Sequence, residues 1–192
     1  LVYPELLDPT KHHQMEVVRA DPGLIELIPN PTKEVCLFSV KADGGNLKHI
    51  KAKYQDKEIC LEAVKSNPIA LRYAKKQNEE IILESVKRDG LMLSYAHKHN
   101  EKIVWEAIKN NPESYKFSRI DSKKVDVEAV ELFAENILYV EKQTEDLAKR
   151  AVDRNYNVFP EYRESDFSFN VLPYINEDLF EDKKSKLMFW KK

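Results

Sequence analysis

A 22-residue spacing between aliphatic residues recurs through most of this chain. The residues that mark it, here called the anchors, are Val18, Val40, Val64, Val86, Ile108, Val130 and Val152. Successive anchors are 22 residues apart, except that Val64 follows Val40 by 24. A fixed period of this size is typical of stacked repeat proteins, in which each unit packs on its neighbours. The spacing therefore predicts a repeat scaffold.

Residues that favour helix ends occur at fixed distances from the anchors. Eight positions before each anchor stands a side chain that can cap a helix start, namely Thr10, Thr32, Asp56, Asn78, Asn100, Ser122 and Thr144. Three positions after the anchor, five of the seven units carry Asp or Asn followed by Pro or Gly. Because Pro is tolerated in a first helical turn but not inside a helix, this pair ends one helix and starts the next. Each unit is expected to hold two helices of about nine or ten residues.

The third unit shows which helix faces should be buried. Its first helix has an apolar surface that covers more than half of its circumference, made of Ile59, Cys60, Leu61, Ala63 and Val64. Its second helix is expected to bury Leu71, Tyr73 and Ala74 and to expose Arg72, Lys75 and Lys76. A helix as apolar as the first needs neighbours on several sides, which stacking supplies.

Two repeat architectures share this period. A leucine-rich repeat needs a strand and an asparagine ladder in each turn, whereas this chain has capping residues and prolines where that strand would run. We therefore predict an all-α solenoid of about seven stacked short helix pairs with atypical ends.

Residues 58–68, EICLEAVKSNP, resemble the unit of a family of short tandem helical repeats of unknown function. Residues 80–90 and 102–112 match the same pattern, E-I-x-L-E-A-V-K-x-N-G or P, whereas Phe133 and Tyr156 depart from it in the last two units. The resemblance extends over about residues 10–165. Such repeats are found in bacterial, phage and giant-virus proteins. The resemblance implies such an origin and carries no catalytic residues.

The ends of the chain do not follow the repeat. Residues 1–9 are expected to cover the first unit, residues 10–165 to form the seven-unit solenoid, and residues 166–192 to form a degenerate repeat or C-terminal capping helix. The apolar run Leu187, Met188, Phe189 and Trp190 could instead be a docking tail.

Composition excludes several classes of protein. The net charge of −2 gives no overall attraction to nucleic acid or to a membrane surface. No run of 18 apolar residues and no signal-like start is present, so we expect a cytoplasmic protein without membrane contact. Cys36 and Cys60 occupy the same repeat position, and we interpret them as small core residues rather than as a disulfide or a metal site.

No pattern in the chain supports catalysis. There is no glycine-rich phosphate loop, nucleophile elbow, H-E-x-x-H or C-x-x-C motif. The five histidines, His12, His13, His49, His97 and His99, have no arrangement typical of catalysis or metal binding. We therefore predict no enzyme activity, no metal site and no cofactor.

Charged residues differ between the two predicted helices of each unit. The first helices carry a recurring set of acids, Glu34, Glu58, Glu62, Glu80 and Glu84, which suggests an acidic layer. The recurring pairs Glu62–Lys65, Glu84–Lys87 and Glu106–Lys109 are interpreted as exposed surface pairs rather than as an ion-binding ladder.

The second helices of four middle units carry exposed cations. Six of them, here called the basic stripe, are the candidate partner-binding residues Lys48, Arg72, Lys75, Lys98, Lys116 and Arg119. A general preference for positive charge at helix C-termini explains Lys75, Lys98 and Arg119, but it does not explain the other three. Both explanations of the stripe stay open.

We predict that the chain is a non-catalytic scaffold that binds a protein partner, plausibly with an acidic surface, through an extended face. A viral or phage accessory protein that sequesters a host protein is the form that the family resemblance suggests. The alternative is binding of a nucleic-acid backbone through the basic stripe. Against it, the aromatic residues beside the stripe, Tyr73, Tyr95, Phe117 and Tyr139, are expected to be buried, leaving no rings for bases to stack on.

Overall fold

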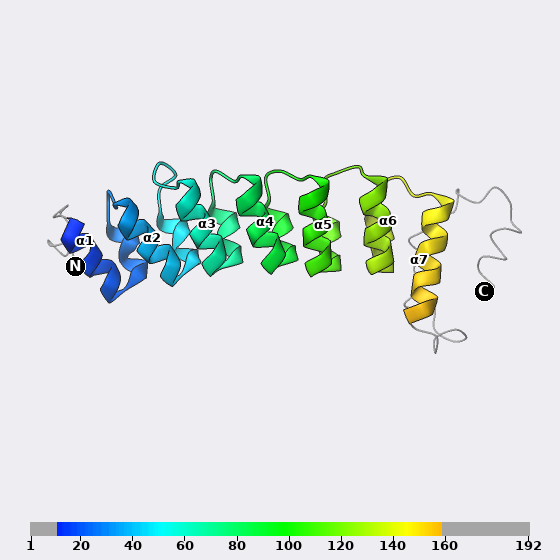
Figure 1. Ribbon diagram of the computed structural model, residues 1–192, viewed down its shortest axis with the longest axis horizontal. Helices are drawn as coiled ribbons and strands as arrows, with labels where there is room; N and C mark the ends of the chain where they lie inside the picture. Colours follow the sequence, from blue (N-terminus) through cyan, green and yellow to red (C-terminus); the bar gives the residue numbers. More distant parts are fainter. Residues whose placement is uncertain (1–10, 159–192) are drawn as a thin grey trace, which may run out of the picture.

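The computed structural model describes residues 11–158, which form one row of stacked helical units (Figure 1). Each unit before the last described helix consists of an α-helix followed by a six-residue 3-10 helix, and this part of the chain contains no strand. The all-α solenoid is thus confirmed, and the leucine-rich alternative is excluded for these residues. Thr10, the segment 1–9 and the segment 166–192 lie outside the described residues.

Two layers run along the stack. The α-helices are α1 (Lys11–Ala20), α2 (Lys33–Ala42), α3 (Lys57–Ser66), α4 (Glu79–Arg88), α5 (Glu101–Asn110), α6 (Lys123–Leu132) and α7 (Glu145–Val158). The 3-10 helices are η2 (Pro22–Leu27), η3 (Gly44–His49), η4 (Pro68–Tyr73), η5 (Gly90–Tyr95), η6 (Pro112–Phe117) and η7 (Ala134–Tyr139). Successive α-helices pack on one another, and so do successive 3-10 helices. No helix among the described residues has the length and hydropathy that crossing a bilayer requires.

The predicted caps define the helix starts. The side chains of Thr32, Asp56, Asn78, Asn100 and Thr144 each accept a hydrogen bond from the N–H three residues further on. Ser122 departs from this pattern, because its hydroxyl donates to Glu101 Oε1 over 2.7 Å and makes no cap. The five predicted Asp and Asn residues between the helices cap the 3-10 helices, each accepting a hydrogen bond from the N–H two residues further on.

The second element of each unit is shorter than expected. The prediction of a second helix of about nine or ten residues is wrong, since six residues form a 3-10 helix instead. A 3-10 helix rises about 2.0 Å per residue against about 1.5 Å for an α-helix. Six residues therefore bring the chain back along most of a ten-residue α-helix, and the residues that follow are extended.

The anchors form the centre of the core. Every anchor from Val18 to Val130 is fully buried, whereas the side chain of Val152 lies outside the described set. Ile59, Cys60, Ala63 and Val64 are buried as expected, and Leu61 is half-buried. Cys36 and Cys60 are free, buried thiols, and burial raises the pKa of each to about 11. This confirms their interpretation as small core residues.

Two kinds of junction alternate from η2 to η6, whereas η7 begins with Ala134 and belongs to neither kind. At what we call the proline junctions, the first residue of the 3-10 helix is a proline whose carbonyl accepts a hydrogen bond from the next unit. Ser39 Oγ donates to Pro22 O over 2.7 Å, and Ser85 Oγ donates to Pro68 O over 2.9 Å. The third proline junction, at Pro112, has no serine, and Asn136 Nδ2 donates to the Pro112 carbonyl instead.

At the glycine junctions, the first residue of the 3-10 helix is Gly44 or Gly90, and its N–H donates to the next unit. The acceptors are Ser66 Oγ at 3.1 Å and Asn110 Oδ1 at 2.7 Å, which belong to the last residues of α3 and α5. A methyl group at either glycine would overlap the carbonyl oxygen of an alanine in that next helix. Glycine is needed here because the backbones approach closely, and its free N–H needs the acceptor.

Glutamine side chains connect successive 3-10 helices, and we call each such connection a glutamine clasp. Gln55 donates to Ile50 O over 2.8 Å and accepts from the N–H of Lys75 over 2.9 Å. Gln77 donates to Leu71 O over 2.9 Å and accepts from the N–H of His97 over 2.8 Å. Each clasp satisfies a carbonyl of its own unit and an N–H of the following one.

The glycine junction predicts a position-dependent loss of stability. Asn110→Ala removes the acceptor of the buried Gly90 N–H, so the free energy of unfolding should fall by about 1–3 kcal/mol. Arg88→Ala is the matched control, because Arg88 ends α4 at a proline junction, where no N–H needs an acceptor. It should change the free energy of unfolding by less than about 1 kcal/mol. Urea denaturation measures both, and equal losses would contradict the junction model.

Candidate partner-binding site

The basic stripe lies on the 3-10 layer. Lys48, Arg72 and Lys116 are the fifth residues of η3, η4 and η6, and Lys75, Lys98 and Arg119 lie in the extended segments that follow η4, η5 and η6. All six side chains are exposed. Because η3 to η6 pack on one another in order, the stripe extends over four consecutive units.

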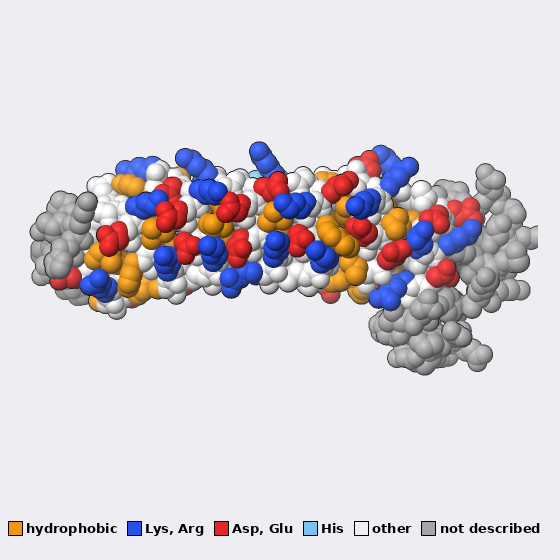
Figure 2. Space-filling model, in the orientation of Figure 1, with side chains coloured by type: hydrophobic (Ala, Val, Ile, Leu, Met, Phe, Trp, Pro, Cys, Tyr) orange, Lys and Arg blue, Asp and Glu red, His pale blue; other side chains and the backbone are white. Residues whose placement is uncertain are grey.

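The α layer carries charge of both signs. Figure 2 shows Lys and Arg side chains interspersed with Asp and Glu side chains along this face. Lys33 Nζ lies 2.7 Å from both Asp56 and Glu58, and Lys57 Nζ lies 2.6 Å from Glu80. Hydrogen bonds to Asp56 and Glu58 raise the pKa of Lys33 to about 12. Lysines at the start of one helix thus pair with acids of the next.

The expectation of an acidic layer on the first helices is therefore wrong. Of the five acids that suggested it, Glu58, Glu62, Glu80 and Glu84 pair with cations from their own or a neighbouring helix. Two of the three expected pairs within a helix form, Glu62–Lys65 at 2.9 Å and Glu106–Lys109 at 2.7 Å. Glu84 instead lies 4.0 Å from Arg88.

The stripe differs from the α layer in its pairing. Within residues 11–158, the side chains of Lys48, Lys75, Lys98 and Arg119 form no ion pair. Lys116 lies 3.7 Å from Glu113, and Arg72 contacts aromatic rings rather than a carboxylate. Four cations of the stripe, one in each of its four units, are consequently not compensated by neighbouring acids, whereas most charge on the α layer is.

The aromatic residues beside the stripe are not buried as expected. Tyr73, Tyr95 and Phe117 are half-buried, and Tyr139 is 45 % exposed. They end four consecutive 3-10 helices, where three residues per turn place each one at the edge of the layer rather than in the core. The 22-residue recurrence of an aromatic residue at this position was the sequence signal for such a row.

Cations of the stripe cover several of these rings. The guanidinium of Arg72 lies 6.0 Å from the centroid of the Tyr73 ring and 5.6 Å from that of Tyr95. Lys116 Nζ lies 5.2 Å from the centroid of Phe117. Cation–π attraction of this kind holds the charges in place above the rings. Arg72 and Lys116 therefore combine positive charge with aromatic surface at fixed positions.

No group of three or more His, Cys, Asp and Glu side chains is placed to hold a metal ion among residues 11–158. His49 Nδ1 lies 3.1 Å from Glu26, and His99 Nε2 lies 3.2 Å from the Ala96 carbonyl. Burial lowers the pKa of His99.

The family comparison agrees with the repeat architecture. The model of a domain of unknown function, DUF4116, matches two adjacent segments, residues 32–77 and 78–120. Each segment spans two α-helices with their 3-10 helices, so the chain is similar to this tandem-repeat family where its own repeats are most regular. Neither a curated protein nor a solved structure matches the chain.

The difference in pairing predicts different responses to charge reversal. Lys75→Glu with Lys98→Glu should change the free energy of unfolding by no more than about 0.5 kcal/mol, because neither lysine has an ion-pair partner among the described residues. Lys33→Glu with Lys57→Glu changes the net charge equally but turns attractive contacts into repulsive ones, so this variant should be less stable. Urea denaturation at low and high salt measures both. The loss of unfolding free energy in the Lys33→Glu with Lys57→Glu variant should be smaller at high salt, because salt screens exposed charges.

Proposed function

We propose that the chain is a non-catalytic repeat scaffold that binds an acidic segment of a protein partner along the basic stripe. The observation that carries the proposal is the uncompensated positive charge on four consecutive units of the 3-10 layer. A row of charge along a stack suits an extended ligand, because each unit can contribute one contact. Complementary charge on the partner would steer association and set its register.

The residue types of the surface also support a protein ligand. Tyr and Arg are enriched among the residues that dominate protein interfaces, and here Arg72 lies over two tyrosine rings. Half-buried rings can bury further apolar area against a partner without first becoming ordered. Such a surface offers both charge and apolar contact.

Nucleic-acid binding is the second candidate, and the exposure of the aromatic row favours it. Single-stranded nucleic acids are bound by grooves that combine cations with rings on which bases stack. However, Arg72 and Lys116 already cover the rings of Tyr73, Tyr95 and Phe117. Tyr139 is the remaining ring of the row with no cation over it in the described residues. Base stacking would have to displace the cations, so we favour the protein ligand.

The proposal predicts loss of binding when the stripe is reversed at Arg72 and Lys116. Arg72→Glu with Lys116→Glu should weaken binding of a captured partner by about tenfold or more at low salt, and the salt dependence should become shallower. Affinity capture with the wild-type chain, run with and without nuclease, isolates the partner for titration. A steep log–log salt slope for an oligothymidylate probe would favour the second candidate instead.

The matched control is Lys87→Glu with Lys124→Glu. Both lysines are exposed on the α layer and form no ion pair within residues 11–158, so the change in net charge is the same. This variant should bind like the wild type. If the stripe variant also binds like the wild type, the stripe is only a solvated surface.

A further inference from the structure

The junction between the units of α5 and α6 departs from the repeat at four positions, three of them changes from an apolar to a polar residue and the fourth a change from Gln or His to Asp. In the three preceding units, the fourth residue of the 3-10 helix is leucine, the residue after that helix is Ile or Ala, the clasp position is Gln or His, and the fourth residue of the next α-helix is Cys, Ile or Val. Here these positions hold Tyr115, Ser118, Asp121 and Asp126. The proline junction at Pro112 also lacks the serine found at the other two. All the changes fall at one place in the stack.

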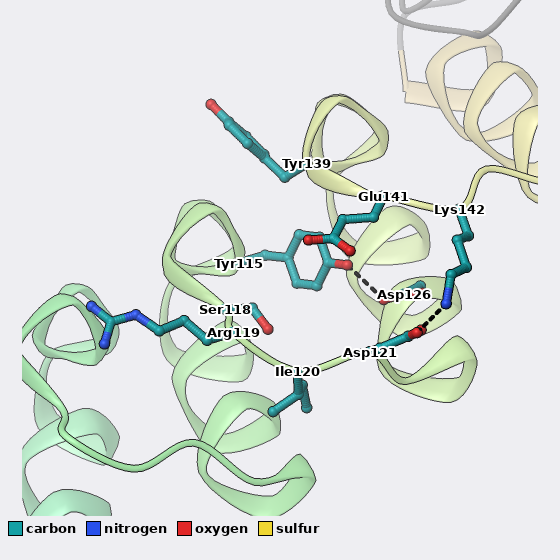
Figure 3. A pocket seen from close by; sticks show the side chains of 9 residues that line it. All are labelled: Tyr115, Ser118, Arg119, Ile120, Asp121, Asp126, Tyr139, Glu141 and Lys142. Carbon is teal, nitrogen blue, oxygen red and sulfur yellow. Dashed lines mark hydrogen bonds and ion pairs between the residues drawn. The ribbon is translucent and has the colours of Figure 1, made fainter.

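The four residues line a single pocket. Its volume is about 360 Å³, within the range of small-ligand sites. Figure 3 shows Tyr115 reaching toward Asp126 of α6, while Glu141 enters from the segment after η7. Asp121 lines the pocket at the position that Gln55 and Gln77 use for their clasps. Asp121 instead pairs with Lys142 at the edge of the pocket.

A buried carboxylate lies inside this pocket without a cation. Asp126 is only 9 % exposed and Tyr115 only 4 %, and the Tyr115 hydroxyl donates to Asp126 Oδ1 over 2.6 Å. Burial, together with the negative charges of Asp121 and Glu141, raises the pKa of Asp126. Lys142 is engaged by Asp121, and Arg119 points away from the carboxylates in Figure 3. A carboxylate in such surroundings is stabilised when a cation joins it.

The polar atoms of the pocket suit an ammonium group. A primary ammonium has three donors, and the pocket offers the Asp126 and Glu141 carboxylates together with the Ser118 hydroxyl. Ser118 Oγ is buried and has no hydrogen-bond partner within residues 11–158. The Tyr115 ring adds an aromatic wall, and the pocket is far larger than a metal ion needs. No metal-holding group was found among the described residues.

We propose that this pocket binds a primary alkylammonium group, of a free amine or of a lysine side chain. The site does not depend on the proposed function of the basic stripe, which carries the opposite charge. The ammonium would donate to Asp126, Glu141 and Ser118, while the Tyr115–Asp126 hydrogen bond holds the buried carboxylate in position.

Titration of the full chain with n-butylamine, followed by calorimetry and by NMR, tests the proposal. Butylammonium should bind with a dissociation constant of about 1 mM or lower and perturb the residues of the pocket. Neutral n-butanol, of the same length, should bind at least about tenfold more weakly. Binding should weaken as the pH falls, because the carboxylates become protonated, and equal binding of butylamine and butanol would overturn the proposal.

Asp126→Asn separates the ligand role from a structural role. The asparagine oxygen can still accept the Tyr115 hydroxyl, so the fold is retained while the negative charge is lost. Affinity for butylamine should fall about tenfold or more. Asp153→Asn, an exposed change on α7 with the same change in charge, should bind as the wild type does. Wild-type affinity in Asp126→Asn would overturn the proposal.

Asp121→Gln provides a second variant that should remain folded. By analogy with Gln55 and Gln77, the new side chain should form a clasp with the Glu141 N–H and fill part of the pocket. Its urea midpoint should rise while butylamine binding falls, and unchanged binding in a folded Asp121→Gln would contradict the assignment. Two further ligands identify the source of the ammonium group. Nα-acetyl-lysine methylamide, whose side-chain ammonium is free, should bind more tightly than butylamine if the pocket takes a lysine side chain. Putrescine should bind more tightly than butylamine if the pocket takes a free diamine.

Discussion

Polar groups of one unit are satisfied by atoms of the next unit throughout residues 11–158. Ser85 donates to the carbonyl of Pro68, Asn110 accepts from Gly90, and Gln77 accepts from the N–H of His97. Helices of six to ten residues are marginal in isolation, and their anchors are buried only when both neighbours are present. Stability therefore resides in the interfaces, and damage to one side chain at a junction affects two units together.

The two layers of the stack divide the charged residues between them. Ion pairs across the α layer, such as Lys57 with Glu80, neutralise charge where neighbouring units meet. The 3-10 layer has few acids, and the stripe cations lie over aromatic rings or extend into solvent, with Lys116 also near Glu113. This separation leaves one side of the solenoid available for recognition. The pocket beside Tyr115 is the place where negative charge interrupts the positive 3-10 layer among the described residues.

Much of the fold was predictable from the sequence, because capping and anchor residues act over a few positions. Thr32, Asp56 and Asn78 define helix starts that the structure confirms. The 3-10 geometry was not predictable in this way, since Leu71 and Ala74 suit either kind of helix and the choice depends on the distance back to the next α-helix. The exposure of Tyr73 follows from that geometry.

The site was harder to predict for a different reason. The six cations of the basic stripe could be located by their recurrence, but whether each one has an acid partner depends on how the units pack. Lys33 reaches Glu58 only because α2 and α3 pack side by side. The pocket depends on residues that break the repeat, and Tyr115 and Asp126 are identified only when each unit is aligned with its neighbours.

The alternation of junctions bears on how such a chain could have grown. Gly44 and its acceptor Ser66 both lie within residues 32–77, and Gly90 and Asn110 both lie within residues 78–120, which are the two segments that match the family model. Copying a single helix pair would separate a glycine from its acceptor and leave a buried N–H unpaired. Copying two pairs together keeps both partners and places a proline, which has no N–H, at the seam between copies. The double unit is therefore the smallest segment of this solenoid that holds both partners of a glycine junction, and lengthening by gene duplication is expected to proceed in steps of about 44 residues, twice the 22-residue period.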